Sequence, residues 1–271
     1  MLDITEKEFA TLAGFIHTNY GIHLTDKKII LMTGRLSNLL EQKNISNFTD
    51  YYNYVVTDQT GQAVKELIDK ITTNHTFFMR EEAHFYYFRD SVLPYMRNTI
   101  TDCDLRIWSA GCSSGEEPYT LSMIIHDYFG CDRLFWDTQL LATDISSTIL
   151  EKAITGLYTG SEIALLPPSW KMNYLHQVGH DLYEIDGAIK KDIIFKRFNL
   201  MEVNYPFKKR FHVIFCRNVM IYFDEKTKEE LIDKFYEALE PGGYLFIGHS
   251  ESINRTKTKF RYVMPAVFRK L

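Results

Sequence analysis

Residues 105–119, LRIWSAGCSSGEEPY, decide the fold of this chain. The apolar start of the stretch predicts a short buried strand, and the small residues at 111–115 predict a tight turn. A helix is expected to begin at Glu116, because two acids and then Pro118 occupy its first turn. A strand, a glycine turn and a helix start together make a ligand seat, since backbone N–H groups are exposed there. An ordinary strand-to-helix turn capped by serine is the alternative interpretation.

The two acids at this helix start, Glu116 and Glu117, limit the kind of ligand. Two carboxylates repel a phosphate group, whereas a cation or a hydroxyl-rich group is favoured. The spacing Gly111-x-x-x-Gly115 also differs from the G-x-G-x-x-G pattern of dinucleotide-binding enzymes. The stretch therefore argues against a pyrophosphate site, and a dehydrogenase is the weakest candidate among the enzyme classes.

The chain after residue 99 alternates strands and helices, which is typical of a parallel sheet covered by helices on both faces. Besides the first strand, strands are expected at 139–142, 193–199, 212–216 and 244–248, with an antiparallel edge pair in 260–268. Helices are expected at 116–128, 146–154 and 225–239, with Pro241-Gly242-Gly243 ending the last one. The pattern breaks at 156–192, where prolines, glycines and short alternating runs predict an inserted antiparallel β-subdomain.

Residues 1–75 are expected to form a small helical domain. Apolar residues recur at helical spacing with breaks near Gly21 and Asn44, and Thr5 with Glu8 fits a capping box. Further helices are expected at 48–56 and 61–71. An aromatic-rich linker helix at 76–98 then joins this domain to a sheet domain at 99–271.

The composition excludes several function classes. The 271 residues carry a net charge of -4, which argues against a general nucleic-acid binder. The first residues, MLDITEKEF, lack the basic segment and apolar run of a signal peptide, and no apolar window approaches the roughly 20 residues that span a bilayer. The four cysteines form no C-x-x-C pair and no zinc-type cluster with histidine. We expect a cytoplasmic protein with reduced thiols, no bound metal and no membrane insertion.

Two groups of polar residues are candidates for ligand binding. Asp144 follows a predicted strand at the carboxyl edge of the sheet, where a carboxylate can accept both hydroxyls of a ribose. An N-cap for the next helix fits its position equally well. Asn74, Thr76 and Arg80 are spaced so that a bent segment can aim all three at one ligand, and the alternative is a helix cap in which Arg80 pairs with a neighbouring acid.

Basic residues follow one predicted helix near the N-terminus. Lys27, Lys28 and Arg35 place positive charge along its surface. One interpretation is an ordinary solvated helix face, and the other is a docking surface for an acidic partner. The residues themselves leave both open.

Six separated stretches agree with one known family. They are TTNHTFFMRE, WSAGCSSGEEPY, LATDIS, FKRFNL, IFCRNVMIYF and PGGYLFIGHSE, which occur in this order between residues 72 and 252. On these motifs the chain resembles the CheR-type chemotaxis receptor glutamate O-methyltransferases, which use S-adenosylmethionine. The resemblance implies an α/β fold: a doubly wound, Rossmann-like methyltransferase sheet with an all-α N-terminal domain and a small inserted antiparallel β-subdomain.

The resemblance also implies roles for individual residues. Asp144 would hold the ribose hydroxyls, Asn199 and Leu200 would frame the adenine, and Glu116 rather than Glu117 would contact the cofactor. The full set implied for cofactor binding is Asn74, Thr76, Arg80, Gly111, Glu116, Asp144, Asn199, Leu200, Arg217 and Asn218. Arg80 and Tyr222 are implied as catalytic residues that steer the acceptor and the sulfonium. Three histidines, His75, His84 and His249, are then expected to be structural.

The implied reaction needs little chemical assistance. A glutamate carboxylate is already ionised at neutral pH, so no general base is required. Aligning its oxygen with the S–methyl bond can supply about 7–11 kcal/mol, and a dry site favours loss of the two opposite charges. The products would be a methyl ester and S-adenosylhomocysteine. A methyltransferase for another acceptor, or a non-catalytic cofactor-binding adaptor, are the alternatives.

The implied partners are the cytoplasmic domains of transmembrane chemoreceptors. Lys27, Lys28 and Arg35 would contact the receptor. Some family members bind a tethering peptide at the receptor C-terminus through a glycine-rich loop, whereas 177–185 here, QVGHDLYEI, has one glycine. We therefore expect this chain to act independently of such a tether.

Overall fold

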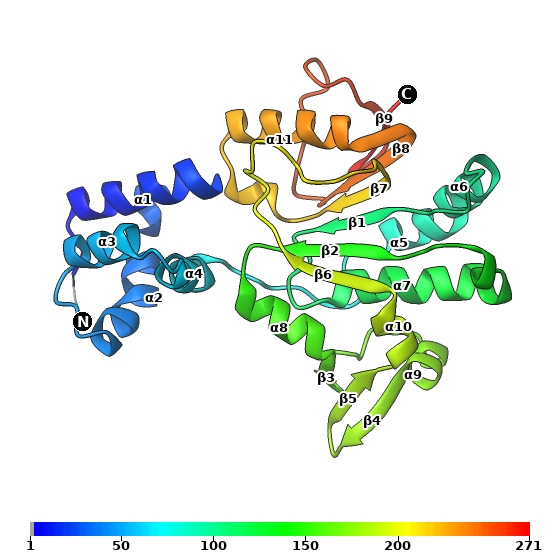
Figure 1. The fold of residues 1–271 in the computed structure, drawn as a ribbon, viewed down its shortest axis with the longest axis horizontal. Coiled ribbons are helices and arrows are strands. Elements are labelled where there is room, and N and C mark those ends of the chain that lie inside the picture. Colours follow the sequence, from blue (N-terminus) through cyan, green and yellow to red (C-terminus); the bar gives the residue numbers. More distant parts are fainter. Residues whose placement is uncertain (1–2) are drawn as a thin grey trace.

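The computed structural model describes residues 3–271, which form a helical bundle and a larger sheet domain (Figure 1). The bundle consists of α1 (Glu6–Tyr20), α2 (Ile29–Gln42), α3 (Phe48–Thr57) and α4 (Gln62–Ile71), with a 3-10 turn, η1 (Asp26–Lys28), before α2. The predicted capping box is confirmed, because Thr5 and Glu8 exchange hydrogen bonds at the start of α1. The predicted break at Gly21 is a left-handed C-cap with φ of 71°. The apolar periodicity therefore gives the expected helical domain.

A seven-stranded sheet forms the centre of the larger domain. Its strands in spatial order are β6 (Ile193–Arg197), β2 (Leu140–Asp144), β1 (Ile107–Ala110), β7 (Phe211–Cys216), β8 (Leu239–Ile247), β10 (Val267–Arg269) and β9 (Arg261–Met264). The strands from β6 to β8 run parallel, and β10 and β9 add the expected antiparallel edge pair. The predicted doubly wound sheet is confirmed.

Helices cover both faces of this sheet (Figure 1). Successive side chains of β7 point to opposite faces, so Val213 and Phe215 belong to one buried cluster and Ile214 and Cys216 to the other. Trp108 of β1 is fully buried in the second cluster. The first cluster is completed by α5 (Ala83–Tyr87), α6 (Leu93–Thr99) and α7 (Glu116–Phe129), and the second by α11 (Glu225–Ala238). Both faces of the sheet are therefore dry.

The connection between the bundle and the sheet differs from the expected single helix at 76–98. Residues 72–77 are irregular, and residues 78–82 form turns. The helical part begins at α5 and continues through a π-helical turn, η2 (Phe88–Val92), into α6. The polar residues before α5 are thus in a bent segment, which leaves their side chains free to face a ligand.

The predicted insertion is a three-stranded antiparallel sheet that projects from one end of the domain (Figure 1). It contains β3 (Leu157–Thr159), β4 (Leu175–Gly179) and β5 (Leu182–Ile185), in the order β3-β5-β4, together with α9 (Pro168–Tyr174). It lies between α8 (Ser147–Thr155) and β6, and α10 (Gly187–Lys191) connects β5 to β6. The 3-10 helix η3 (Gly130–Phe135) comes earlier in the chain, directly after α7. The β-subdomain prediction is confirmed.

One strand boundary was misplaced by the sequence pattern. Strand β8 begins at Leu239, immediately after α11, whereas the strand was expected only from residue 244. Leu239 pairs with Phe211, and the pairing then shifts register before Val213 pairs with Tyr244. Gly242, with φ of 82°, accommodates this irregularity. Pro241-Gly242-Gly243, which was expected to end the helix, instead lies at an irregularity inside the strand, and α11 ends before it at Ala238.

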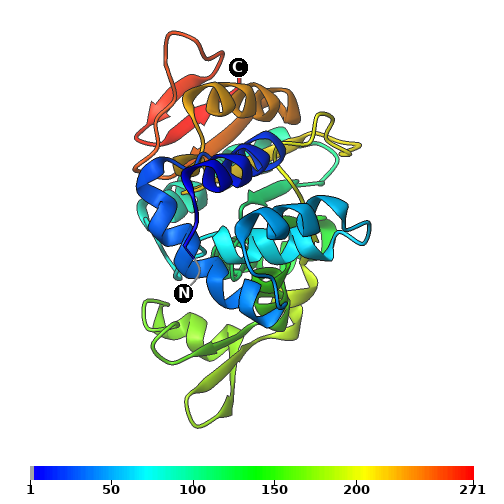
Figure 2. The ribbon, with the colours of Figure 1, turned by 90° about the vertical axis from the view of Figure 1, so that its left-hand side faces the viewer.

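The bundle is fastened to the sheet domain at several points (Figure 2). Ile22 forms an antiparallel bridge with Phe223, and the backbone N–H of His23 donates to the carbonyl of Tyr222. The side chain of Asn199 donates to the carbonyl of Asn19. These contacts lie at the carboxyl ends of the parallel strands, so the bundle forms one wall over that edge of the sheet.

None of the helices in residues 3–271 combines the length and the apolar character that crossing a bilayer requires.

The turn after β1 tolerates only glycine at its first position. Gly111 has φ of 90°, and an added Cβ would lie 2.3 Å from Cγ2 of Val219. We expect Gly111→Ala to lower the free energy of unfolding by about 2–4 kcal/mol, from left-handed backbone strain and overpacking. Gly14→Ala is the control, since that position is open and helical, and alanine there should add about 0.5–1 kcal/mol. Urea unfolding followed by circular dichroism measures both, and equal effects would contradict the assignment.

Candidate active site

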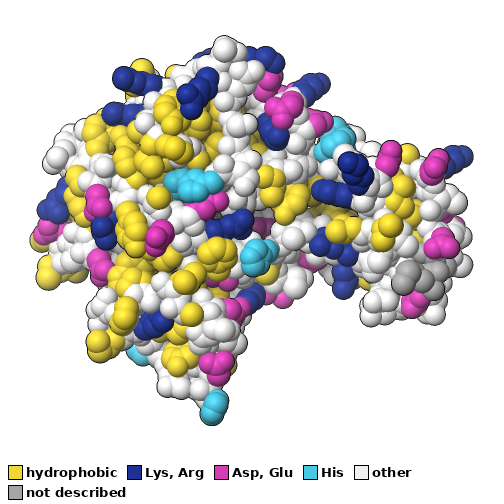
Figure 3. Space-filling model, turned by 180° about the vertical axis from the view of Figure 1, so that it is seen from behind, with side chains coloured by type: hydrophobic (Ala, Val, Ile, Leu, Met, Phe, Trp, Pro, Cys, Tyr) yellow, Lys and Arg dark blue, Asp and Glu magenta, His cyan; other side chains and the backbone are white. Residues whose placement is uncertain are grey.

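A cavity lies between the carboxyl ends of the parallel strands and the helical bundle. It contains about 1120 Å³ of empty space, including the part open to solvent, which is the size of a cofactor site. Figure 3 shows the surface hollowed between the two parts, with Lys and Arg side chains gathered along the hollow. The lining includes Tyr20, Ile22, Asn74, Thr76, Arg80, Gly111, Ser113, Glu117, Asp144, Asn199, Leu200, Arg217, Asn218, Val219, Tyr222 and Phe223.

The turn at 111–115 provides space more than hydrogen bonds. The backbone N–H groups of Gly111 and Cys112 both donate to the carbonyl of Thr143, and Gly115 donates to Cys112. These N–H groups do not converge on a ligand, which corrects the expectation from the sequence. The absence of bulky side chains at the turn is what lets a ligand approach β1.

Asp144 stands at the end of β2 and fixes the neighbouring turn. Its Oδ2 accepts from the backbone N–H of Ser113 at 2.9 Å, and its Oδ1 accepts from that of Ser146 at 3.0 Å. Burial raises the pKa of Asp144, although these backbone hydrogen bonds oppose the shift. The alternative role as an N-cap is wrong, because Ser146 caps α8 by accepting from Ile149. A carboxylate has about four acceptor positions, so capacity remains for a diol in the cavity.

The two acids of α7 face different environments. Glu116 is buried away from the cavity, and its carboxylate accepts from the hydroxyl of Ser114. Burial raises the pKa of Glu116. Glu117 lines the cavity and accepts from the hydroxyl of Ser109 at 2.7 Å. Of the two acids, Glu117 rather than Glu116 faces the cavity, so we propose Glu117 for the cofactor contact that the resemblance implied for Glu116.

Arg217 connects three segments of the site. Its guanidinium lies 2.9 Å from the Glu117 carboxylate and 3.1 Å from the Glu81 carboxylate, and it donates to the carbonyl of Arg80. It also lies over the ring of Phe85, 5.1 Å from the centroid. Burial alone would raise the pKa of Glu81, but Arg217, the Asn218 amide and the backbone N–H of His249 together hold that pKa below its ordinary value. The guanidinium therefore lies between two carboxylates in the wall of the cavity.

The irregular segment before α5 forms a cover over the cavity. The hydroxyl of Ser113 donates to the carbonyl of Asn74 at 2.9 Å, and the guanidinium of Arg80 donates to the carbonyl of His75 at 2.8 Å. The expected pairing of Arg80 with a neighbouring acid is not formed; its side chain folds back over its own segment. Positive φ angles at Met79 and Glu81, 60° and 58°, produce the sharp bend. Asn74, Thr76 and Arg80 are thus brought to one cavity, as predicted.

The segment after β6 closes the other end. Asn199 and Leu200 both line the cavity, as predicted. The amide of Asn199 donates to the carbonyl of Asn19 and accepts from the backbone N–H of Met201. Tyr20 and Ile22 of the bundle complete this wall. No sequence pattern indicates their place in the cavity, because their contacts with the sheet domain are long-range.

The loop after β7 is fixed by Glu251, an acid whose role no sequence pattern indicates. Glu251 accepts from the backbone N–H groups of Asn218 and Met220, at 3.0 and 2.6 Å. Asn218 has φ of 61° and donates its amide to Glu81. Tyr222 follows in the same loop, and its hydroxyl donates to the carbonyl of Thr73 at 3.3 Å. The loop is therefore fixed while Tyr222 reaches the cavity mouth.

The three basic residues of the bundle are not equivalent. Lys27 is exposed, and the ammonium of Lys28 lies 5.5 Å from the ring centroid of Tyr222 at the cavity mouth. Arg35 instead donates to the carbonyls of Ile71 and Thr72 and to the hydroxyl of Thr73. The guanidinium of Arg35 therefore secures the start of the cover segment, and its predicted contact with the receptor stays a prediction.

Comparison with known proteins identifies the family of this chain. The family description "CheR methyltransferase, SAM binding domain" matches residues 74–268, and "CheR methyltransferase, all-alpha domain" matches residues 7–72. The chain belongs to the CheR methyltransferase family. It is 44% identical to the chemotaxis protein methyltransferase of Borreliella burgdorferi, over 99% of this chain and 96% of the relative, and 33% identical to that of Escherichia coli, over 96% and 89%. The chain is therefore a methyltransferase of chemotaxis that uses S-adenosylmethionine.

The cavity fits this cofactor. Asp144 offers a carboxylate for the ribose diol, and Asn199 and Leu200 lie at a wall where a flat base can be enclosed. Arg80 and the cover segment lie where the amino-acid end of the cofactor would be held, since a carboxylate binds a guanidinium well. When bound, S-adenosylmethionine supplies an electrophilic methyl on a sulfonium. We assign cofactor contacts to Asn74, Thr76, Arg80, Gly111, Glu117, Asp144, Asn199, Leu200, Arg217 and Asn218 as a proposal from this geometry.

The raised pKa of Asp144 predicts a pH-dependent affinity. The ionised carboxylate accepts the diol, so lowering the pH through its raised pKa should weaken S-adenosylhomocysteine binding, and the loss should begin above the ordinary value of 3.8. Asp144→Asn should weaken binding by about 10- to 100-fold at neutral pH, because a hydrogen bond to a charged group is worth about 1.5–3 kcal/mol. Its affinity should then vary less with pH. Calorimetry across pH 4–8 tests this, with circular dichroism verifying the fold; parallel curves for both proteins would contradict it.

Proposed function

We propose that this methyltransferase esterifies glutamate side chains in the cytoplasmic domains of chemoreceptors. The observation that carries the proposal is the balance of charge around the cavity mouth. Lys28 lies beside Tyr222, and Arg80 lines the cavity next to the cover segment. Cations at the entrance favour an acceptor that is itself an anion. The relatives named as chemotaxis methyltransferases support the same acceptor class.

The reaction balances without a proton. A carboxylate oxygen of the acceptor forms a bond to the methyl carbon, the S–methyl bond breaks, and its electron pair stays on sulfur. The positive sulfonium and the negative carboxylate both become neutral. Among the described residues that line the cavity, His75 is the one histidine, and its side chain is exposed rather than buried as a base in the cavity. An ionised acceptor suits such a site.

Positioning is the main task of the protein in this proposal. Tyr222 is held by its hydrogen bond to the cover segment and stands between Lys28 and the cavity. We assign it to the region of the transferred methyl, and we assign Arg80 to steering the charged groups. Glu251 acts indirectly by fixing the loop after β7, and Arg217, besides its assigned cofactor contact, fixes the cover segment that presents Arg80.

The β-subdomain supports a tether-independent enzyme. Strands β4 and β5 are joined by a tight connection at 180–181, and the pairing shifts register between Gln177 and Gly179. Gly179 is the one glycine of this hairpin. The subdomain thus lacks the glycine-rich loop that binds a receptor tail in some family members. A receptor without its C-terminal tail should therefore be methylated at nearly the same rate as the complete receptor.

The acceptor is tested by methyl transfer to receptor-containing membranes. The chain is incubated with S-adenosylmethionine labelled in the methyl group, using receptors with and without the C-terminal tail. We expect label in the receptor that mild base releases as methanol, at similar rates for both receptors. Base-stable label would indicate another acceptor, and absence of transfer with intact cofactor binding would indicate a signalling adaptor. A large loss on removing the tail would contradict tether independence alone.

Lys28 should act on the receptor more than on the cofactor. Lys28→Glu places a negative charge at the cavity mouth, so we expect the KM for receptor to rise about tenfold, a cost of about 1.4 kcal/mol, while S-adenosylhomocysteine affinity changes little. Lys226→Glu is the matched control, because Lys226 is an exposed lysine of α11 outside the cavity wall. Equal effects of the two variants, or a loss of cofactor affinity as large as the rise in KM, would contradict the assignment.

A further inference from the structure

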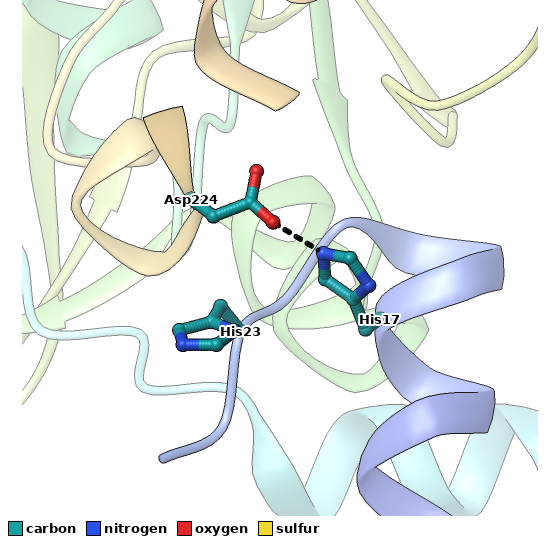
Figure 4. A group of neighbouring side chains, drawn as sticks. All are labelled: His17, His23 and Asp224. Atoms are coloured by element: carbon teal, nitrogen blue, oxygen red, sulfur yellow. Dashed lines mark hydrogen bonds and ion pairs between the residues drawn. The ribbon is translucent and has the colours of Figure 1, made fainter. Parts of the chain in front are cut away.

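Three side chains that we call the junction triad meet where the bundle joins the sheet domain: His17, His23 and Asp224 (Figure 4). Their nitrogen and oxygen ligand atoms all lie within 4.8 Å of one another, and Nε2 of His17 is 2.7 Å from Oδ2 of Asp224. His17 is in the last turn of α1, and Asp224 is the N-cap of α11. The triad therefore draws on three segments that are far apart in sequence or separated by a helix end.

Hydrogen bonds fix the backbones of His17 and His23 and one carboxylate oxygen, Oδ1, of Asp224. The backbone N–H of Gly21 donates to the carbonyl of His17, and that of His23 donates to the carbonyl of Tyr222, both at 2.8 Å. The backbone N–H of Thr227 donates to Oδ1 of Asp224 at 2.8 Å. Oδ2 of Asp224 faces Nε2 of His17, so these two atoms and the imidazole nitrogens of His23 are the ones that would meet an ion.

The geometry points to a binding site for a divalent transition metal of the zinc class at the junction triad. Two imidazoles and one carboxylate form a ligand set suited to Zn²⁺, which takes three protein ligands and a water at bonds of about 2.0–2.1 Å. Tetrahedral ligand atoms would then lie roughly 3.4 Å apart. His17 and Asp224 need to separate slightly from their hydrogen-bond distance, and His23 needs to approach. All three side chains are at least partly exposed, so rotation about their side-chain bonds provides these movements.

A second group with metal-type residues is less suitable. Glu81, His84 and His249 also bring their ligand atoms within 4.8 Å. The Glu81 carboxylate already pairs with Arg217 and accepts from Asn218. A cation placed there would be repelled by the buried guanidinium. In the described residues no lysine or arginine forms an ion pair with the junction triad, and its one acid pairs with His17.

A metal at the triad would connect the bundle to the loop after β7, which carries Tyr222 and Phe223. His23 is next to Ile22, which bridges to Phe223, and its own N–H bonds to Tyr222. An ion held by His17, His23 and Asp224 would therefore stabilise the wall formed by Ile22, Tyr222 and Phe223. The sequence did not indicate this site, because Asp224 becomes a neighbour of the two histidines only through the fold.

The test is metal binding by the full chain, purified without a polyhistidine tag and with Cys131→Ser to remove an exposed thiol. Zn²⁺ is titrated by calorimetry, and Co²⁺ is added to record its visible absorption. His23→Ala removes one ligand and leaves the His17–Asp224 pair. Asp224→Asn keeps an oxygen to cap α11 but removes the charge. His176→Ala is the matched control, since His176 makes the same 2.7 Å pair with Asp186 on the β-subdomain but belongs to no three-ligand group among the described residues.

We expect one Zn²⁺ per chain, a four-coordinate Co²⁺ spectrum, and a Tm that rises with Zn²⁺. His23→Ala and Asp224→Asn should each weaken binding at least tenfold and abolish the rise in Tm, and His176→Ala should change neither. Circular dichroism in EDTA checks that each variant is folded; His23→Ala decides alone if Asp224→Asn is not. Absence of one-to-one binding, unchanged affinity in His23→Ala, or an equal loss in His176→Ala would overturn the proposal.

Discussion

The active site depends on one buried guanidinium. Arg217 at the end of β7 holds Glu117 of α7 and Glu81 of the cover segment, and it donates to the carbonyl of Arg80. Removing one partner of such a buried pair typically costs about 3–5 kcal/mol, because the remaining charge has no partner. An apolar replacement of the whole group is often no less stable, so stability alone does not explain it. The ion pairs instead fix one relative arrangement of α7, the cover segment and the end of β7 at the cavity.

The cavity is a product of the junction between two domains. The sheet edge contributes Asp144 and the turn after β1, while the bundle contributes Tyr20 and Ile22. Arg35 binds the carbonyls at the start of the cover segment, so α2 and the cover are connected directly. Parallel sheets bind ligands at the carboxyl ends of their strands because loops there are free to vary. Here one of those walls is a separate helical domain, and the alignment of the acceptor depends on how that domain is seated.

The sequence predicts the secondary structure well because buried strands and amphipathic helices have different periods. It also indicates Asp144, since an acid directly after a buried strand must lie at the sheet edge. It fails for Glu116 and Glu117, because neighbouring helix residues point about 100° apart and only the packing of α7 shows which one meets Arg217. The sequence also does not show the hydrogen bonds of Arg35 to the cover segment, for a related reason. A charge pattern cannot show that a long side chain is occupied by carbonyls of a distant segment, and Asn199 with Asn19 is a similar case.

The charged residues of the cavity, Arg217, Glu81, Glu117 and Asp144, are arranged in a way that is compatible with methyl transfer. Arg217 pairs with both Glu81 and Glu117, so each of these carboxylates already has a cationic partner. Asp144 is occupied by backbone N–H groups, and its remaining acceptor positions suit neutral hydroxyls. Under the proposed function, an acceptor carboxylate is the anion that arrives without a partner of its own. Such an anion beside a sulfonium gains when both charges disappear, so the surrounding protein needs chiefly to provide alignment and exclude water.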